Sequence, residues 1–409
     1  MYKIFINRII YILITITLFS CKEDEIIVPI IEEGDFSAIY NLPSEPFNYS
    51  AINFPITFTN FVFEELDNTP DNNHITNNGA TLGRVLFYDK NLSLNNTISC
   101  ASCHLQEFGF TDPREKSIGF EGGHTRRNSM NLTNSRFYLK EKFFWDHRAS
   151  TLEEQVLMPL QDDIEMGMTL DLVVSRVSSF DYYKPLFAKA FGNDIVTTDK
   201  ISKALAQFIR SIYSFNSKYD VGIEATRNIF VDFPNFTAQE NLGKDIFNGK
   251  LTPEANGSCV FCHMNDNPSE IHFSTTPSLN ANQVIFTGTR TDNIGLDEDS
   301  RGDSDNGLGE ITNIEADNGQ FKVPSIRNIE LTSPYMHDGR FTTLEEVVEH
   351  YSTEVKDHPQ LSDHLINPDE TPRHLNLSEE EKAALVAFLK TLTDEVMISD
   401  VKYSDPFVE

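Results

Sequence analysis

The chain has 409 residues, of which 39% are hydrophobic, and its 62 Asp and Glu outnumber 33 Lys and Arg to give a formal net charge of −29. This length has room for two domains, each with its own core. The acidic excess argues against nucleic acid as a partner, because phosphate binding needs a surplus of Lys and Arg. It suits a basic protein partner or a small neutral molecule, although solubility alone also accounts for it.

The chain begins with a short hydrophobic leader. Lys3 and Arg8 precede the apolar run Ile9–Phe19, which is too short for a comfortable membrane span. Cys21 lies two residues after the run, and Leu18-Phe19-Ser20-Cys21 resembles a bacterial lipobox. We expect residues 1–21 to be a lipoprotein signal whose lipidated Cys21 anchors the mature protein in the periplasm or at the cell surface. The alternative is an ordinary secretory leader with an incidental cysteine.

The other four cysteines form two C-x-x-C-H motifs, at residues 100–104 and 259–263. This motif attaches c-type haem: both thiols add to the porphyrin, and the adjacent histidine binds the iron. A zinc ribbon would need its two pairs about 15–20 residues apart, and a thiol redox motif does not need the trailing histidine. We therefore predict two covalently bound haem c groups. Their attachment residues would be Cys100, Cys103 and His104 in the first motif and Cys259, Cys262 and His263 in the second.

The segments around the two motifs are related to each other. Leu82–Lys90 precedes the first motif and Leu242–Lys250 the second, and both read Leu-Gly-basic followed by an aliphatic residue and Phe. Such a repeat indicates two related haem domains. Thr237 with Glu240, and Ser378 with Glu381, are capping boxes that predict helix starts.

Strand-like alternation is scarce, so we expect a mainly α fold with long loops around haem. The predicted organisation is a polar, acidic tether over residues 22–75, an N-terminal haem domain over 76–235 and a C-terminal haem domain over 236–409.

Further motifs accompany the two haem sites. They are Phe143-Phe144-Trp145-Asp146-His147-Arg148, Gln155 with Glu165-Met166-Gly167, Val323-Pro324-Ser325-Ile326-Arg327-Asn328 and Pro334-Tyr335-Met336-His337-Asp338-Gly339. Together with the haem motifs they resemble the bacterial di-haem cytochrome c peroxidases and their MauG-type relatives, over about residues 76–395.

The resemblance implies a role for each haem. The N-terminal haem, with His104 as its proximal ligand, would react with hydrogen peroxide, and the C-terminal haem would relay electrons. Glu165 matches the family's acidic residue on the peroxide side, and Gln155 matches its neighbour. A carboxyl there could move a proton between the two peroxide oxygens, and burial would raise its pKa towards the working range.

The resemblance also assigns Trp145 to the space between the haems, as an electron relay; an ordinary core residue is the alternative. Asn128, Thr332 and Pro334 match an inter-domain calcium site, whose oxygen ligands suit that ion. His147 departs from the family, which usually has glycine at this position.

A second departure concerns access to the peroxide-reacting iron. Typical members carry a histidine that blocks this iron until the partner haem is reduced, and here Phe120 takes that position. Because a phenyl ring cannot ligate iron, we predict an open or water-bound site in the oxidised protein. His124 is a rival ligand, although a surface loop histidine is the simpler interpretation.

The third departure is at the relay haem. Where typical members have a methionine as sixth ligand, this chain has Tyr351, as MauG-type enzymes do. A phenolate stabilises ferric iron and lowers the haem potential relative to methionine. His350 and Met336 are alternative candidates for the sixth ligand. If Tyr351 is not a ligand, ordinary helix packing explains its presence.

Three functions follow from the resemblance. The first is an exported di-haem peroxidase that reduces hydrogen peroxide with electrons from a small cytochrome c or copper protein. The second is a MauG-like oxidase that modifies a residue of another protein, and the third is a non-enzymatic di-haem electron carrier.

Overall fold

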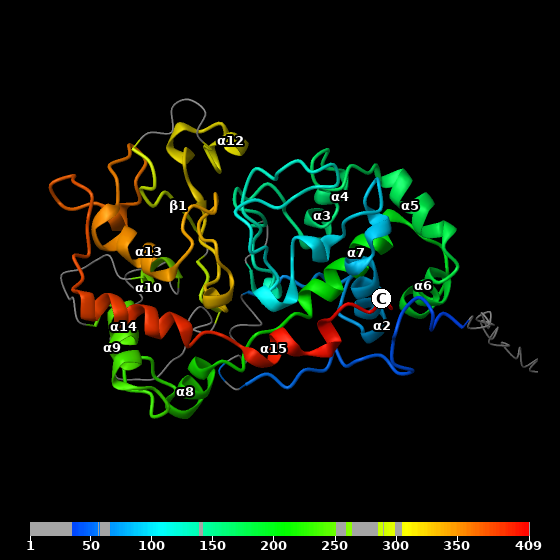
Figure 1. The fold of residues 1–409 in the computed structure, drawn as a ribbon, viewed down its shortest axis with the longest axis horizontal. Coiled ribbons are helices and arrows are strands. Elements are labelled where there is room, and N and C mark those ends of the chain that lie inside the picture. Colours follow the sequence, from blue (N-terminus) through cyan, green and yellow to red (C-terminus); the bar gives the residue numbers. More distant parts are fainter. Residues whose placement is uncertain are drawn as a thin grey trace, which may run out of the picture. The chain divides into compact units, whose positions relative to one another are not determined.

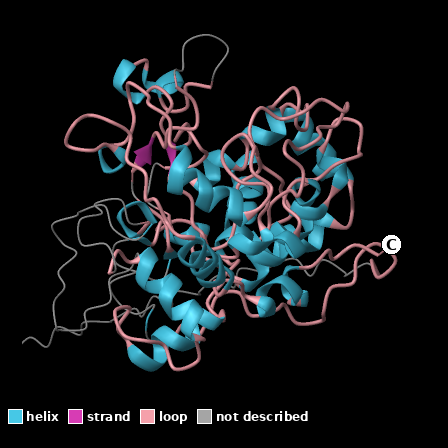
Figure 2. Cartoon of the chain, turned by 60° about the vertical axis from the view of Figure 1, so that its left-hand side comes forward, coloured by secondary structure: helices cyan, strands magenta, loops and turns pink. Residues whose placement is uncertain are grey.

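Helices and loops make up almost all of the computed structural model, as Figures 1 and 2 show. The structure describes residues 35–55, 57, 66–138, 142–250, 259–263, 285–288, 290–298 and 305–408. The expected leader, with Cys21, and the start of the tether lie outside these residues. The prediction of a mainly α fold is confirmed. Within the described ranges, no helix has the length and apolar character needed to cross a bilayer.

The first helix pair consists of α2 (Asn77–Tyr88) packed along α7 (Thr198–Arg210). The Thr76 side chain caps α2 by accepting a first-turn N–H at 3.0 Å, which satisfies an amide that has no partner inside the helix. Gly83 permits the close packing, because a Cβ there would lie 1.9 Å from the Ala204 carbonyl oxygen.

The second helix pair repeats this arrangement with α9 (Ala238–Phe247) and α14 (Glu379–Lys390). Both predicted capping boxes are present at the starts of these helices. Gly243 lies against α14 as Gly83 lies against α7: a Cβ on Gly243 would be 1.9 Å from the Ala384 carbonyl oxygen. The repeated Leu-Gly-basic segments therefore make equivalent helix contacts.

Each helix pair belongs to its own hydrophobic core. The first core takes buried side chains from α2, α5 (Leu170–Ser179), α6 (Tyr183–Phe191) and α7, and the second from α8 (Lys218–Thr226), α9, α13 (Leu344–Glu349) and α14. We refer to the described residues of 66–213 as the N-terminal lobe and to those of 217–392 as the C-terminal lobe. Both lie within one compact unit of the chain.

The last described segment returns to the N-terminal lobe. After α15 (Glu395–Ser399), Tyr403 is buried in the first core, and its hydroxyl donates to the Ser211 carbonyl oxygen at 2.6 Å. The Arg84 Nε donates to the Ser404 carbonyl oxygen at 2.6 Å. These residues therefore complete the N-terminal core, although they follow the C-terminal lobe along the chain.

The remaining regular elements are short. Strand β1 (Thr291–Asp292) pairs antiparallel with β2 (Phe321–Lys322), with Thr291 opposite Lys322 and Asp292 opposite Phe321. The short helices are α3 (Leu152–Gln155), α4 (Met158–Gln161), α10 (Val260–His263) and α12 (Gly309–Thr312). Long loops between these elements carry most of the predicted site residues.

Candidate functional site

The first C-x-x-C-H motif begins in a tight 3-10 turn, η3 (Cys100–Ser102). The His104 backbone N–H donates to the Cys100 carbonyl oxygen at 3.0 Å, so thiols and imidazole are held on one short turn. The His104 Nδ1–H donates to the Phe110 carbonyl oxygen at 2.9 Å. Since Nδ1 carries the proton, the lone pair of Nε2 is available to bind iron. Burial lowers the pKa of His104, which favours this neutral form.

The second motif places its histidine in the same state by a different contact. His263 ends α10, and its Nδ1–H donates to the Pro324 carbonyl oxygen at 3.1 Å. Burial lowers the pKa of His263 to about 4, so the ring is neutral at pH 7 and its Nε2 is available. The two histidines therefore offer equivalent iron-binding nitrogens.

All four motif thiols are free of disulfides. Burial is the main cause that raises the pKa of Cys100 to about 12, and of both Cys103 and Cys259 to about 11, and it raises the pKa of Cys262 further. The side chains are therefore neutral thiols at pH 7. Two free thiols and one unprotonated imidazole nitrogen on a single turn fit covalent attachment of haem c in each lobe.

Glu165 lies in the loop after α4, close to the first motif. Its carboxylate is among the charges that, after burial, raise the pKa of Cys100 and Cys103. Burial raises the pKa of Glu165 itself to about 7; the Asp162 carboxylate contributes to this rise, and the Arg148 guanidinium opposes it. A partly buried carboxyl with this pKa can both accept and donate a proton near neutral pH.

Phe120 lies directly against the Glu165 loop. Its backbone N–H donates to the Glu165 carbonyl oxygen at 3.0 Å, and the Asn95 side chain donates to the Phe120 carbonyl oxygen at 2.5 Å. The buried Phe120 ring covers Gly167, where a Cβ would lie 2.5 Å from ring carbons. His124 is exposed in the turn that follows.

Gln155 ends α3 in the same lobe, and it is partly buried. Its backbone N–H donates to the Thr151 carbonyl oxygen at 2.9 Å, which is the first turn of that helix. No contact between the side chains of Gln155 and Glu165 is present among the described residues.

Trp145 is held by contacts to both lobes. Its indole Nε1–H donates to the Asn128 carbonyl oxygen at 2.9 Å, and the Asn128 N–H donates to the His337 carbonyl oxygen at 2.8 Å. The Trp145 carbonyl oxygen accepts the Lys322 backbone N–H of β2 at 2.7 Å. Trp145 therefore lies where the N-terminal and C-terminal lobes meet.

Two bases beside Trp145, Lys322 and His147, lie in surroundings that the sequence motifs did not predict. The Lys322 Nζ is buried without a hydrogen-bond partner in the described part of the chain, 3.6 Å from the centre of the Tyr138 ring. Burial lowers the pKa of Lys322 to about 7. Burial and then Lys322 lower the pKa of His147 to about 3, and its backbone has a positive φ of 57°. The positive φ accounts for the glycine usual at this position in the family.

Tyr351 lies in a π-helical turn, η9 (His350–Glu354), that continues α13. Burial raises the pKa of the Tyr351 hydroxyl, and the charges of Cys262 and Cys259 raise it further, which places the phenol near the second haem motif. The neighbouring His350 uses its Nε2–H to donate to the Ile294 carbonyl oxygen at 2.9 Å. Met336 lies in a separate turn with a φ of 73°.

The residues expected to bind calcium lie near the contact between the lobes. The Asn128 Nδ2 donates to the carbonyl oxygens of Arg114 and Glu115, each at 3.3 Å. Thr332 and Pro334 precede His337, whose carbonyl oxygen accepts the Asn128 N–H.

Comparison with known proteins agrees with this arrangement. The family model for di-haem cytochrome c peroxidase matches residues 77–228. The cytochrome c551 peroxidase of Nitrosomonas europaea is 34% identical over 327 residues, which are 80% of this chain and 82% of that protein. The methylamine utilization protein MauG of Methylophilus methylotrophus is 30% identical over 323 residues, 79% of this chain and 84% of that protein.

Solved structures give the same result. A MauG-like protein associated with microbial copper homeostasis is 36% identical, with a TM-score of 0.66 over 82% of this chain and 95% of that chain. The di-haem peroxidase BthA of Burkholderia thailandensis shares the fold at 22% identity, with a TM-score of 0.62 over 84% of this chain and 93% of that chain. With two haem-attachment motifs, two equivalent helix pairs and these relatives, the chain belongs to the family of di-haem cytochrome c peroxidases and MauG proteins.

Proposed function

We propose that this protein is an exported di-haem peroxidase that reduces hydrogen peroxide to water with electrons from a small redox protein. The observation that carries the proposal is the Glu165 carboxyl, which lies near the first haem motif with its pKa raised by burial to about 7. A protein that only carries electrons has no need of such a group.

Glu165 performs the proton transfer in this proposal. Cys100, Cys103 and His104 would hold the haem, whose iron would supply the site for peroxide binding and reduction. The Glu165 carboxylate takes the proton from one peroxide oxygen and returns it to the other, which leaves as water. Two electrons and two protons convert each hydrogen peroxide into two water molecules. Gln155 is assigned to this pocket by the family resemblance and would orient the substrate.

Cys259, Cys262 and His263 would hold the haem that accepts electrons from the donor, and Trp145 would relay them to the N-terminal lobe. The position of the indole between the lobes supports this role. The net charge of −29 favours a basic donor, such as a small cytochrome c, or a copper protein with a basic face.

Phe120 leaves the peroxide-reacting iron accessible in the oxidised protein. Its ring packs on Gly167 beside Glu165 and offers no ligand atom. The protein would therefore react with peroxide without prior reduction of its partner haem.

A MauG-like oxidase is the second candidate, and Tyr351 is the observation that favours it. A phenolate ligand would lower the potential of the C-terminal haem, which favours storing oxidising equivalents over receiving electrons from a mild donor. Two relatives named above are MauG or MauG-like proteins. The target would then be a side chain of another protein.

Two further assignments belong to this proposal. Asn128, with the backbone oxygens of Thr332 and Pro334, would bind calcium where the lobes meet. Lipidated Cys21 would hold the protein at a bacterial membrane, facing the periplasm or the outside.

The deciding experiment is peroxide-dependent oxidation of a reduced small cytochrome c by the protein as isolated, without pre-reduction. Rapid turnover is expected. No turnover with either a basic cytochrome c or a basic copper protein as donor, by a protein with both haems attached, would reject the peroxidase and move the MauG-like oxidase to first place. An EPR spectrum showing only a bis-ligated low-spin N-terminal haem would contradict the open site.

A further inference from the structure

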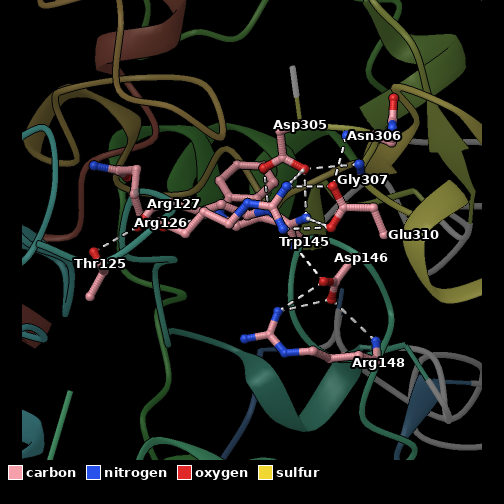
Figure 3. Close-up of polar contacts among 11 residues, drawn as sticks. Thr125, Arg126, Arg127, Trp145, Asp146, Arg148, Asp305, Asn306, Gly307 and Glu310 are labelled. Atoms are coloured by element: carbon pink, nitrogen blue, oxygen red, sulfur yellow. Dashed lines mark hydrogen bonds and ion pairs between the residues drawn. The ribbon is translucent and has the colours of Figure 1, made fainter. Parts of the chain in front are cut away.

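One arginine joins the two lobes through a buried pair of ionic contacts. The Arg127 guanidinium donates through Nη1 to Asp146 in the N-terminal lobe. Its Nε and Nη2 donate to the two carboxylate oxygens of Asp305 in the C-terminal lobe, both at 2.7 Å. Figure 3 draws this network. The three side chains are only 8%, 5% and 15% exposed, respectively, so solvent and salt screen these contacts weakly.

The same residues surround Trp145. Asp146 follows Trp145 in the chain, and Asn128, which accepts the indole N–H, follows Arg127. The segments 127–128 and 145–146 are therefore connected twice, by an ion pair and by a hydrogen bond. Because Arg127 also forms hydrogen bonds with both carboxylate oxygens of Asp305, it connects the segment that contains Trp145 directly to the C-terminal lobe.

We propose that Arg127 is a positioning residue that holds Trp145 at its place between the two lobes and thereby sets the rate of electron transfer between the two haems. This inference rests on the relay role proposed for Trp145. The step transfers one electron from the reduced haem of the C-terminal lobe to the oxidised haem of the N-terminal lobe, without making or breaking a bond. Two such transfers serve each peroxide.

The geometry requires an arginine. Its planar fork binds both oxygens of Asp305 and still directs one N–H at Asp146, whereas a lysine offers a single charged nitrogen. Although burial raises the pKa of Asp305, hydrogen bonds from Arg127 and from the Gly307 N–H, together with the charges of Arg127 and Arg126, lower it to about 2. Asp305 is thus ionised at neutral pH, and loss of Arg127 would remove the cation that links it to Asp146.

Arg126 provides a matched control in the adjacent position. It pairs with Glu310 and, at 3.3 Å, with Asp305, so it also connects the lobes. Its side chain is 58% exposed and makes no contact with Asp146 among the described residues. Exposed ion pairs of this kind contribute little to stability. A substitution of Arg126 therefore removes one positive charge and one contact between the lobes but leaves the link to Trp145 intact.

The experiment uses the full chain with both haems attached and fully oxidised. A flash-generated flavin radical delivers one electron, and absorbance follows its redistribution between the haems. We expect Arg127→Gln to slow redistribution by about tenfold or more, because a misplacement of about 1 Å in a positioned group can cost up to about 100-fold in rate. The redistribution rate of Arg126→Gln should stay within about twofold of that of the unaltered protein. The rate of Arg127→Lys should lie between those of Arg127→Gln and the unaltered protein.

An unchanged rate in Arg127→Gln, with an unchanged thermal midpoint, would overturn the proposal. If this variant does not fold, Asp305→Asn removes the same bridge from the other lobe, and an unchanged rate there overturns it equally. Equal slowing by Arg126→Gln would assign the effect to general lobe contact and also reject the proposal. Because the flash needs no peroxide, this outcome is independent of whether the protein proves to be a peroxidase.

Discussion

The two lobes use the same helix pair and the same haem motif but position their histidines differently. In both lobes a glycine lets two helices approach closely: Gly83 of α2 lies against α7, and Gly243 of α9 lies against α14. A Cβ on either glycine would lie 1.9 Å from a backbone carbonyl oxygen of the partner helix. His104 is oriented by Phe110, only a few residues along the chain. His263 is oriented by Pro324, which arrives from a distant segment. The main contact that orients His104 is therefore local, whereas the contact that orients His263 forms only when a distant segment has folded against it.

The other predicted site residues of the two lobes differ more. The N-terminal lobe presents Glu165, an acid–base group, beside Phe120, which cannot bind iron. The C-terminal lobe presents Tyr351, whose phenol oxygen is able to bind iron. In the proposed function, this shared scaffold would serve two purposes: proton transfer at one haem and ligand control of potential at the other.

The largest expected effect comes from removing the proton-transfer group. Glu165→Gln should lower the rate of peroxide reduction by about 10²–10⁴-fold, the usual contribution of a positioned acid–base group. In the unaltered protein the rate should rise as pH increases through about 7, because only the ionised carboxyl accepts the first proton. Stopped-flow rates across pH test both points.

Asp163→Asn is the matched control for this substitution, since Asp163 is exposed in the same loop. It should leave the rate and its pH profile unchanged. Retained peroxide reactivity in Glu165→Gln would instead support the electron carrier.

Phe120→His would make the peroxide site resemble that of typical family members. An imidazole placed beside Glu165 should bind the iron and slow peroxide reaction of the oxidised protein by about tenfold or more, a barrier increase of about 1.4 kcal/mol. EPR should show a second bis-ligated low-spin haem. Phe120→Leu should leave the site open, and an unblocked iron in Phe120→His would show that residue 120 does not face it.

Tyr351→Met should change the reduction potential and the spectrum of the C-terminal haem only. Replacing a phenolate by a thioether should raise the potential of that haem by on the order of 0.1 V. A methionine-to-iron band should appear near the red end of the spectrum, and the other haem should titrate as before. Spectroelectrochemistry measures both potentials. If Tyr351→Phe leaves the spectrum and potential unaltered, Tyr351 is not a ligand.

The last prediction concerns stability alone and tests the equivalence of the two helix pairs. Gly83→Ala and Gly243→Ala each force a Cβ against backbone, and each should reduce stability by about 1–3 kcal/mol. Calorimetry should show similar losses from the two substitutions. Gly123→Ala is the control, because its Cβ would meet only a side-chain carbon of Ile164 at 3.3 Å. Unequal losses would indicate that only one helix pair depends on close approach.

Local features of the chain could be predicted from the sequence. The capping boxes at Thr237 and Ser378 start helices because a side chain and a backbone amide three residues later satisfy each other. The C-x-x-C-H turns are equally local, since the bond from the His104 N–H to the Cys100 carbonyl oxygen needs no other part of the chain.

The family motifs identified Glu165, Phe120 and Tyr351 as residues of interest but did not describe their surroundings. That Phe120 covers Gly167 and bonds to the Glu165 backbone depends on two loops meeting. The buried Lys322 and the Arg127 bridge had no sequence signal, because lysines and arginines are usually exposed.

By itself, the sequence determined the two haem-attachment turns, the capped helices and the mainly α character, because these depend on residues a few positions apart. The tertiary structure alone decided that Pro324 orients His263, that the segment around Tyr403 completes the N-terminal core, and that Arg127 reaches Asp305. Each of these contacts joins residues remote in sequence, and their geometry exists only once both cores have packed and excluded water from between them.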